Sequence, residues 1–380
     1  MNKTILHIGC LLAGLAAFAA CTKDDYKPGQ PSEKEEETYK PAERIDGRVA
    51  VGYVTYYGSK IPEPAVLTHI CYAFAELYIK DGKYAGFKLQ GNESRFKSIA
   101  DLKKSAPHLK ILLSFTHTVS NSDNAQAGGF SLLSKTEEGR KGFAEDCKSF
   151  LINWGIDGID IDWELPGISW SGHACDPAVD TENHVKLVKQ LRETLGTKYL
   201  VTLAGYVMDK QPTGNGGYKY VDIKAVEPYV DFINIMTYDL DAAPNHHSAL
   251  DDPSAYWDCK RTINAYKAAG FPVAKMVLGI PFYGRHSFDV SPTAINYNKI
   301  LGLDTGTYQI DNWDAGASVP YVTNKKTKAY YCGYDNAQSI AIKGDWIRSL
   351  GLKGMMFWDY DGDDYKGTLR HAVWEAVMKP

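Results

Sequence analysis

Eight short runs rich in β-branched and aromatic residues alternate with helix-patterned segments from residue 48 to the end of the chain. Repeated strand–helix alternation is typical of a parallel sheet covered by helices, because each crossover returns the chain to the same end of the sheet. Eight such units over about 330 residues favour a closed (β/α)8 TIM barrel, an α/β fold. The predicted strands are Val49–Val54, Leu67–Phe74, Lys110–Phe115, Ile156–Asp162, Tyr199–Gly205, Asp231–Thr237, Met276–Phe282 and Lys353–Trp358.

Two observations refine this prediction. An open, doubly wound sheet is the alternative, but no glycine-rich phosphate-binding turn follows the first predicted strand. Residues 286–335, between the seventh strand and the helix before the eighth, break the alternation with turn residues and β-like pieces such as Ala329-Tyr330-Tyr331. We expect a small α+β insertion there, packed beside the cleft and not forming a separate domain.

Helix-spaced apolar residues mark several segments between the strands. One helix is predicted before the fourth strand, with Ser134 and Glu137 as a capping box at its start. A second helix precedes the fifth strand, and a third runs from about Trp257 and ends at Gly270. The apolar residues that define the first two helices are Phe143, Cys147, Phe150, Leu151, Trp154, Val188, Leu191 and Leu195.

The beginning of the chain differs in composition from the rest. Residues 1–21 contain a lysine, an apolar run and small residues before Cys21, which resembles a signal peptide ending in a bacterial lipobox with Cys21 as the lipidated residue. An ordinary secretory signal with a nearby cysteine is the alternative. Residues 22–46 are rich in Pro, Lys, Glu and Ser and are predicted to be a flexible linker. The folded part is therefore expected to be 47–380.

The residues after the lipobox bear on location. The stretch Thr22-Lys23-Asp24-Asp25 resembles the acidic export tag of some Gram-negative surface lipoproteins. We therefore expect a lipid-anchored protein of the cell envelope, held in the outer membrane and exposed at the surface. A periplasmic orientation stays open, and the lipid anchor would be the only contact with the membrane.

Composition argues against several classes of site. The five cysteines after the linker are an odd number without short spacings, which fits neither a zinc site nor a dense disulfide framework. One bridge, such as Cys175 with Cys259, stays open. The formal net charge is −4 with mixed signs, which argues against a nucleic acid partner. We expect a monomer without metal or cofactor.

The most informative segment is Asp157–Glu164, at the fourth predicted strand. Because side chains alternate along a strand, three acids share one face and the apolar residues share the other. An apolar outer face packs against helices, so the acids point toward the barrel axis and its C-terminal mouth, where barrel enzymes hold their active sites. The acids are Asp160, Asp162 and Glu164, and the apolar residues are Ile159, Ile161 and Trp163.

Electrostatics favours a catalytic role for these acids. Neighbours on this face lie about 6.7 Å apart, and two such charges repel by about 2.5 kcal/mol at an effective dielectric of about 20. This repulsion predicts a pKa of about 6 for Glu164, so that its carboxyl can act as a general acid near neutral pH. A calcium site is the alternative, but calcium ligands gather in loops and not along a buried strand.

The segment Asp157–Glu164 resembles the D-G-x-D-x-D-x-E signature of glycoside hydrolase family 18, the chitinases and their relatives. The resemblance extends over nearly the whole chain from about residue 48. One element departs, because Ser114-Phe115-Thr116-His117 stands where the family has Ser-x-Gly-Gly. Loss of the glycines implies a reshaped edge of the cleft, and the short insertion implies a shallower groove. Further matching elements are Ala73-Phe74, Met236-Thr237-Tyr238-Asp239, Tyr283 with Arg285, and Trp358.

The resemblance implies a retaining, substrate-assisted mechanism, in which the 2-acetamido oxygen of the sugar attacks the anomeric carbon, a known property of this family. Glu164 would protonate the leaving oxygen and then act as a base. Asp162 would hold the acetamido N–H, and Asp160 would share charge or a proton with Asp162. Tyr238 would donate to the acetamido oxygen, and Trp358 would support the distorted sugar. The other predicted substrate-binding residues are Asp239, Arg285, Tyr283, Phe74, Ser114, which would also support the inner acids, and Met236, whose role would be mainly packing.

The implied reaction is cleavage of β-1,4 bonds next to N-acetylglucosamine in chitin or chito-oligosaccharides. An endo-β-N-acetylglucosaminidase that acts on N-glycans is one alternative, because the third-strand segment is altered. A catalytically silent glycan-binding surface protein is another, although silent relatives usually lack the terminal acid that Glu164 provides. Trp170 and Trp257 are either sugar-stacking platforms or packing residues.

Overall fold

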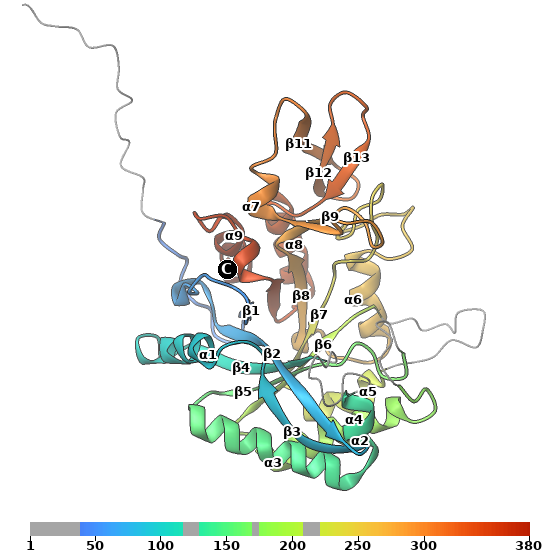
Figure 1. Cartoon of the computed structure of the whole chain (residues 1–380). Helices are drawn as coiled ribbons and strands as arrows, with labels where there is room; N and C mark the ends of the chain where they lie inside the picture. The colour runs from blue at the N-terminus through green and yellow to red at the C-terminus, as the bar shows by residue number, and fades with distance from the viewer. Residues whose placement is uncertain (1–38, 117–128, 169–174, 208–220) are drawn as a thin grey trace, which may run out of the picture. The chain divides into compact units, whose positions relative to one another are not determined.

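The computed structural model describes residues 39–116, 129–168, 175–207 and 221–380 (Figure 1). Its main sheet has the order β1-β14-β8-β7-β6-β5-β4-β2-β3, and an additional β1–β2 pairing closes eight parallel strands into a barrel. The predicted (β/α)8 fold is therefore confirmed. The barrel strands are β1 (Val49–Thr55), β2 (His69–Lys80), β4 (Lys110–Thr116), β5 (Gly158–Asp162), β6 (Leu200–Gly205), β7 (Phe232–Ile235), β8 (Met276–Pro281) and β14 (Gly354–Trp358).

Strand β2 continues beyond its predicted end and forms a hairpin with β3 (Lys83–Leu89). The early part of β2 pairs in parallel with β1 and β4, whereas its later part pairs antiparallel with β3. The turn consists of Asp81 and Gly82, whose φ angles are 51° and 73°. Both angles are positive, as a tight two-residue hairpin turn requires.

The two faces of the barrel strands hold different residues. Strand β5 places Ile159 and Ile161 in the large core outside the barrel, together with Trp163 just beyond its end. The interior holds a smaller apolar cluster from the other faces of the strands, so Asp160 and Asp162 point inward as the alternation predicts. The buried residues of the interior cluster are Val49, Val51, Tyr53, Cys71, Ala73, Leu112, Phe232, Met236, Tyr238, Val277, Tyr283 and Met356.

Helices lie outside the barrel strands (Figure 1). Three of them, α3, α4 and α6, lie where the sequence predicts helices. The α-helices are α1 (Glu93–Ala100), α2 (Gly129–Lys135), α3 (Glu137–Trp154), α4 (Asp180–Leu195), α5 (Ile223–Val226), α6 (Cys259–Ala268), α7 (Tyr297–Ile300), α8 (Ala337–Leu350) and α9 (Thr368–Met378).

The predicted capping box of Ser134 and Glu137 is wrong. Ser134 lies inside the preceding helix α2, and Glu137 is the first residue of α3. The N-cap of α3 is Thr136, whose side-chain oxygen accepts the N–H of Gly139 at 3.1 Å. The sequence pattern fails here because two helices follow each other directly, and the true cap has a glycine where a capping box has Glu or Gln.

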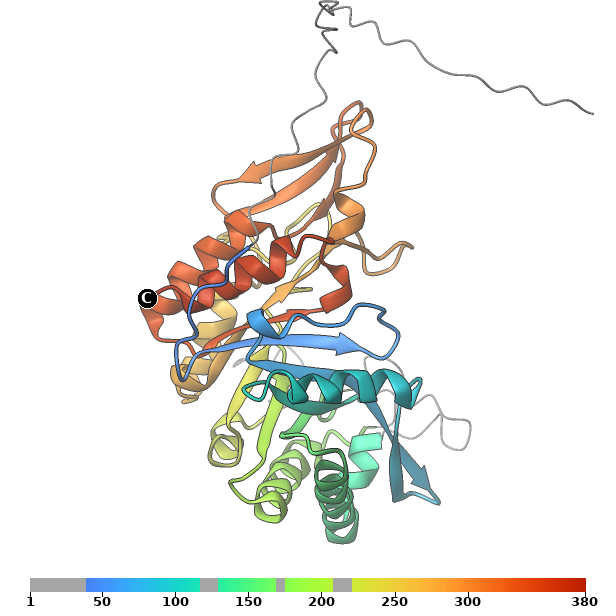
Figure 2. The same ribbon diagram turned by 90° about the vertical axis from the view of Figure 1, so that its left-hand side faces the viewer.

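A second sheet lies between β8 and α8 in the sequence. Its order is β10-β9-β13-β12-β11, and all its pairings are antiparallel. Figure 2 shows the orange and red helices α8 and α9 packed side by side, with this sheet above them. Its strands are β9 (Tyr283–Arg285), β10 (Ala294–Asn296), β11 (Tyr308–Asp314), β12 (Val319–Asn324) and β13 (Tyr330–Gly333).

The cysteines of the described residues are all free, including Cys175 and Cys259. The bridge considered between these two therefore does not form. Cys259 is buried at the start of α6, where its thiol lies 3.6 Å from the carbonyl oxygens of Thr237 and Ser248. Within the described ranges, no helix has the length and apolar character needed to cross a membrane.

Candidate active site

The C-terminal ends of the barrel strands and the start of the second sheet surround a cleft of about 850 Å³. Nine of the predicted site residues line it: Phe74, Asp162, Glu164, Met236, Tyr238, Asp239, Tyr283, Arg285 and Trp358. Sequence reasoning did not assign the other lining residues: Tyr57, Thr116, Tyr206, Leu240, Phe288, Thr293, Ala294, Asn296 and Asp359.

Asp160 lies beneath the cleft and is completely buried. The strand register explains its partners, because Asp160 pairs across the sheet with Ser114 on β4 and with Thr202 on β6. Both hydroxyls donate to its carboxylate, at 2.8 Å and 2.5 Å, and the Tyr53 hydroxyl donates at 2.8 Å. Burial raises the pKa of Asp160, and these hydrogen bonds oppose the rise. Ser114 therefore contacts the innermost acid and does not line the cleft.

Asp162 and Glu164 form a contacting pair at the bottom of the cleft. Burial, the Glu164 charge and a hydrogen bond with Glu164 all raise the pKa of Asp162. Burial also raises the pKa of Glu164, which the bond from Asp162 lowers and the Asp239 charge raises further. The expected direction for Glu164 is thus found, but the main cause is burial and not repulsion along the strand.

The two oxygens of Asp162 have different surroundings. The carboxyl group of Asp162 is hydrogen-bonded with that of Glu164. Its Oδ1 atom is buried and has no hydrogen-bond partner among the residues that the structure describes. A buried acceptor without a partner is costly, so this oxygen is suited to accept a donor from a bound molecule.

Tyr238 and Asp239 follow β7, the strand that lies across the barrel from β2, and line the cleft from that side. Burial and then the nearby Asp162 charge raise the pKa of Tyr238 well above its usual value, so its hydroxyl remains a donor. Asp239 binds Arg285 through both carboxylate oxygens, at 2.8 Å and 2.5 Å. Burial would raise the pKa of Asp239, but hydrogen bonds from His247 and Arg285 lower it to about 2. Asp239 is therefore ionised and held in place.

A cluster of three aromatic side chains comes from β1, β2 and β14. The rings of Phe74 and Trp358 are stacked, with centroids 5.6 Å apart and an interplanar angle of 23°. Tyr53 supports Trp358 from the barrel interior at 5.7 Å. Trp358 is only partly buried and lines the cleft, so its exposed face is available to an apolar sugar face.

The structure tests one of the two tryptophans considered as sugar-stacking platforms or packing residues. Trp170 lies outside the described residues. Trp257 packs edge-on against Tyr256 at 5.5 Å and does not line the cleft. The metal-ligating side chains in the described part of the chain form no cluster suited to a metal ion.

Fold and site together define a (β/α)8 barrel with a carboxylate pair and aromatic rings at its C-terminal mouth, the arrangement of barrel glycosidases. Comparison with known proteins gives the family: residues 49–363 match the glycosyl hydrolases family 18, and the chain belongs to it.

Relatives and solved structures agree with this assignment. The chain is 32% identical over 317 residues to Chitinase A1 of Niallia circulans, covering 72% of this chain and 43% of that protein. It is 29% identical over 303 residues to Chitinase 63 of Streptomyces plicatus, covering 74% of this chain and 47% of that protein. The chain thus spans less than half the length of these two relatives. A family 18 N-acetylglucosaminidase from Paenibacillus barengoltzii superposes with a TM-score of 0.71 at 26% identity, covering 87% of this chain and all of that one.

Proposed function

We propose that the protein is a retaining glycoside hydrolase that cleaves β-1,4 bonds next to N-acetylglucosamine in chitin or chito-oligosaccharides. The observation that carries this proposal is the Asp162–Glu164 pair with raised pKa values at the bottom of a cleft lined by Trp358 and Tyr238. A carboxyl whose pKa is raised by burial is suited to protonate a leaving oxygen.

The placement of the carboxylates favours attack by the substrate's own acetamido group. Asp239 is held by Arg285, and Asp359 caps the turn after β14 by accepting the Gly362 N–H at 3.1 Å. Neither is free to act as a nucleophile from the far side of the sugar, which conventional retaining enzymes require. Placing the acetamido oxygen beside the anomeric carbon makes the attack intramolecular and thereby lowers its entropic cost.

In the first step, the acetamido oxygen bonds to the anomeric carbon while the bond from that carbon to the glycosidic oxygen breaks. Glu164 gives its proton to the departing oxygen. The unpaired Asp162 oxygen accepts the acetamido N–H, and the Tyr238 hydroxyl donates to the acetamido oxygen. In the second step, water attacks the anomeric carbon, Glu164 takes its proton, and the acetamido group is restored. Each step inverts the carbon once, so the product retains the β configuration.

Proton NMR of the first product from chitotetraose tests this mechanism. We expect a β anomer at early times and negligible cleavage of a fully deacetylated oligomer, which lacks the attacking group. An α anomer appearing first, or rapid cleavage of the deacetylated oligomer, contradicts the mechanism.

An endo-β-N-acetylglucosaminidase that acts on N-glycans is the second candidate. Thr116, in the segment that departs from the family pattern, lines the cleft and supports a reshaped edge. The names of the matched relatives, which are chitinases, favour the first candidate. Parallel digestion of chitotetraose and a high-mannose glycopeptide separates the two, because the preferred substrate identifies the activity.

We also propose that the protein is lipid-anchored in the cell envelope, in the outer membrane and facing outward, as a monomer. The support is the lipobox-like segment ending at Cys21 and the acidic residues after it. Fractionation of cells and protease treatment of intact cells test the location and the orientation.

A further inference from the structure

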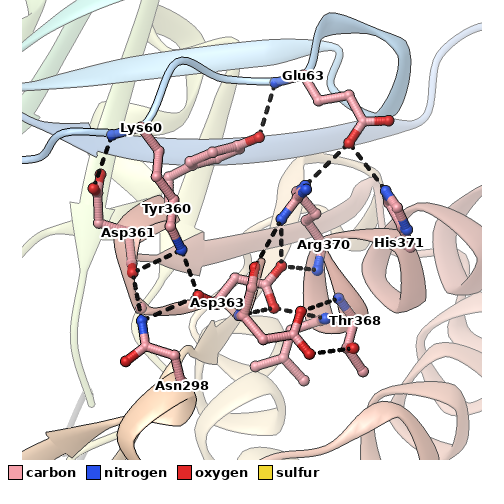
Figure 3. A network of polar contacts seen from close by, with 12 residues as sticks. Lys60, Glu63, Asn298, Tyr360, Asp361, Asp363, Thr368, Arg370 and His371 are labelled. Carbon is pink, nitrogen blue, oxygen red and sulfur yellow. Dashed lines mark hydrogen bonds and ion pairs between the residues drawn. The ribbon is translucent and has the colours of Figure 1, made fainter. Parts of the chain in front are cut away.

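One wall of the cleft is built from two segments far apart in the sequence. Tyr57 follows β1 and Asp359 follows β14, and both side chains line the cleft. Asp361 joins the two segments: its Oδ1 atom accepts the backbone N–H groups of Ser59 at 2.7 Å and Lys60 at 3.0 Å. Figure 3 shows this carboxylate beside the backbone of Lys60.

The glycine between Tyr57 and Ser59 shows how closely the two segments approach. A Cβ atom at Gly58 would overlap Oδ2 of Asp361. The backbone of the loop after β1 therefore rests directly on the Asp361 carboxylate, and only a residue without a side chain fits there.

A second layer of contacts fixes the backbone around Asp361. The Lys60 ammonium donates to the carbonyl oxygens of Asp361, at 3.1 Å, and Asp363. The amide of Asn298, from α7 of the region with the second sheet, donates to the same two carbonyl oxygens, each at 3.1 Å. Figure 3 shows Lys60 and Asn298 converging on this turn, so three regions of the chain are joined at one place.

The second oxygen of Asp361 has weaker contacts. The nearest cation is an Arg95 nitrogen at 3.8 Å. Both this nitrogen and Oδ2 of Asp361 are buried and lack a hydrogen-bond partner among the described residues. Taking a carboxylate out of water is costly, so its hydrogen bonds to the loop must offset much of that cost. The main structural role of this carboxylate is thus to hold the backbone of Ser59 and Lys60.

We propose that Asp361 is a positioning residue for substrate selection: it holds the loop after β1 in place, and thereby sets how the cleft binds chito-oligosaccharides longer than two sugars. Tyr57 is 62% exposed and belongs to this loop. Tyr57 and Trp358 line the same cleft, so a chain with one sugar stacked on Trp358 would need further sugars to reach Tyr57. This inference rests on the proposed glycosidase function.

The test compares Asp361→Ala with wild type on chitohexaose and on a chromogenic chitobioside. We expect KM for chitohexaose to rise about 2–13-fold, the contribution of one aromatic contact. The kcat values, and KM for the chitobioside, should change less than about twofold, because the Asp162–Glu164 pair is untouched. Asp361→Asn keeps an oxygen that accepts the loop N–H groups, so its KM for chitohexaose should stay close to the wild-type value.

Hydrogen exchange gives a readout that does not depend on activity. The Ser59 and Lys60 amides should be protected in wild type and in Asp361→Asn, and should lose protection in Asp361→Ala. Gly58→Ala, which displaces the loop while keeping Asp361, should show the same selective rise in KM and carries the test if Asp361→Ala does not fold. Glu63→Gln is the matched control, since it weakens only the contacts with Arg370 and His371 in the same network (Figure 3).

Three results would overturn the inference: equal changes in KM for both substrates, amides that stay protected in Asp361→Ala, or the same selective effect in Glu63→Gln. Failure of the proposed function looks different. In that case wild type cleaves neither substrate, while the exchange experiment still decides whether Asp361 holds the loop.

Discussion

The environment of Glu164 sets the pKa of its carboxyl group. Burial raises the pKa of Glu164, and the hydrogen bond from Asp162 opposes part of this rise. Glu164→Gln keeps the shape of the side chain and removes the transferable proton. Turnover should fall about 10²–10⁴-fold while oligosaccharide binding survives. Steady-state kinetics and calorimetry measure the two effects, with the exposed Glu145→Gln on α3 as the control. Turnover within a few-fold of wild type would refute the assignment.

The Asp239–Arg285 pair makes a pH-dependent contribution to stability. The folded pKa of Asp239, about 2, lies below its ordinary value of 3.8. The contribution is therefore fully present above about pH 4 and is lost as the pH falls toward 2. Arg285→Met should lower the free energy of unfolding by about 2 kcal/mol at pH 7, and the difference from wild type should shrink between pH 4 and 2.

Denaturant unfolding at several pH values measures this difference. The control is Arg44→Met, because the Arg44–Asp46 pair is exposed, at 44% and 94%, and contributes little. A difference that stays constant down to pH 2 would show that Asp239 is not the group responsible.

At the scale of elements, α8 is fixed by a completely buried ion pair. Lys343 donates to Asp335 at 2.6 Å, and both side chains are 0% exposed. Ser248 and Ser339 also donate to this carboxylate, at 2.6 Å and 2.7 Å. Lys343→Met leaves the Asp335 charge without a cation and should cost about 3–5 kcal/mol. Urea unfolding measures the loss. Asp335→Asn added to Lys343→Met should recover part of it, and no recovery would contradict the ion-pair explanation.

The sequence predicts the barrel strands and the side chains at their ends, because the alternation of side chains follows directly from strand geometry. Asp162 and Glu164 are predictable for this reason. Helix boundaries are less predictable. Ser134 and Thr136 are both plausible N-cap residues, and Thr136 is the N-cap of α3 because α2 immediately precedes it and contains Ser134. The hairpin of β2 and β3 is not among the predicted elements, although its Asp81-Gly82 turn is a recognisable signal.

Loop residues of the cleft are the least predictable. Tyr57 and Asn296 line the cleft from loops and from the second sheet, where no periodicity indicates the direction of a side chain. Their positions follow from long-range contacts, such as those of Asp361 with Ser59, between residues about 300 positions apart. Such contacts leave no local pattern in the sequence.

At the scale of the whole molecule, the proposed anchor decides where the barrel works. Each buried CH₂ of an acyl chain contributes about 0.8 kcal/mol to membrane binding, so a cysteine with two or more chains holds a protein firmly. Ala42 is held on α9 by hydrogen bonds with Trp374 and Glu375. The predicted flexible chain that remains, residues 22–40, would span about 24 Å. The anchor would then keep the cleft near the cell while letting it approach a polymer outside.

Cys21→Ser removes the site of lipidation and should release the protein from membranes without changing its specific activity, because Cys21 lies outside the folded barrel. Ultracentrifugation of lysates and mass spectrometry of the N-terminus measure release and lipid mass. Cys10→Ser is the matched control, since Cys10 lies inside the predicted signal peptide and its substitution should leave the anchor intact. Wild-type protein in a detergent-free soluble fraction, with no lipid on its N-terminus, would refute the anchor and leave the ordinary secretory signal as the explanation.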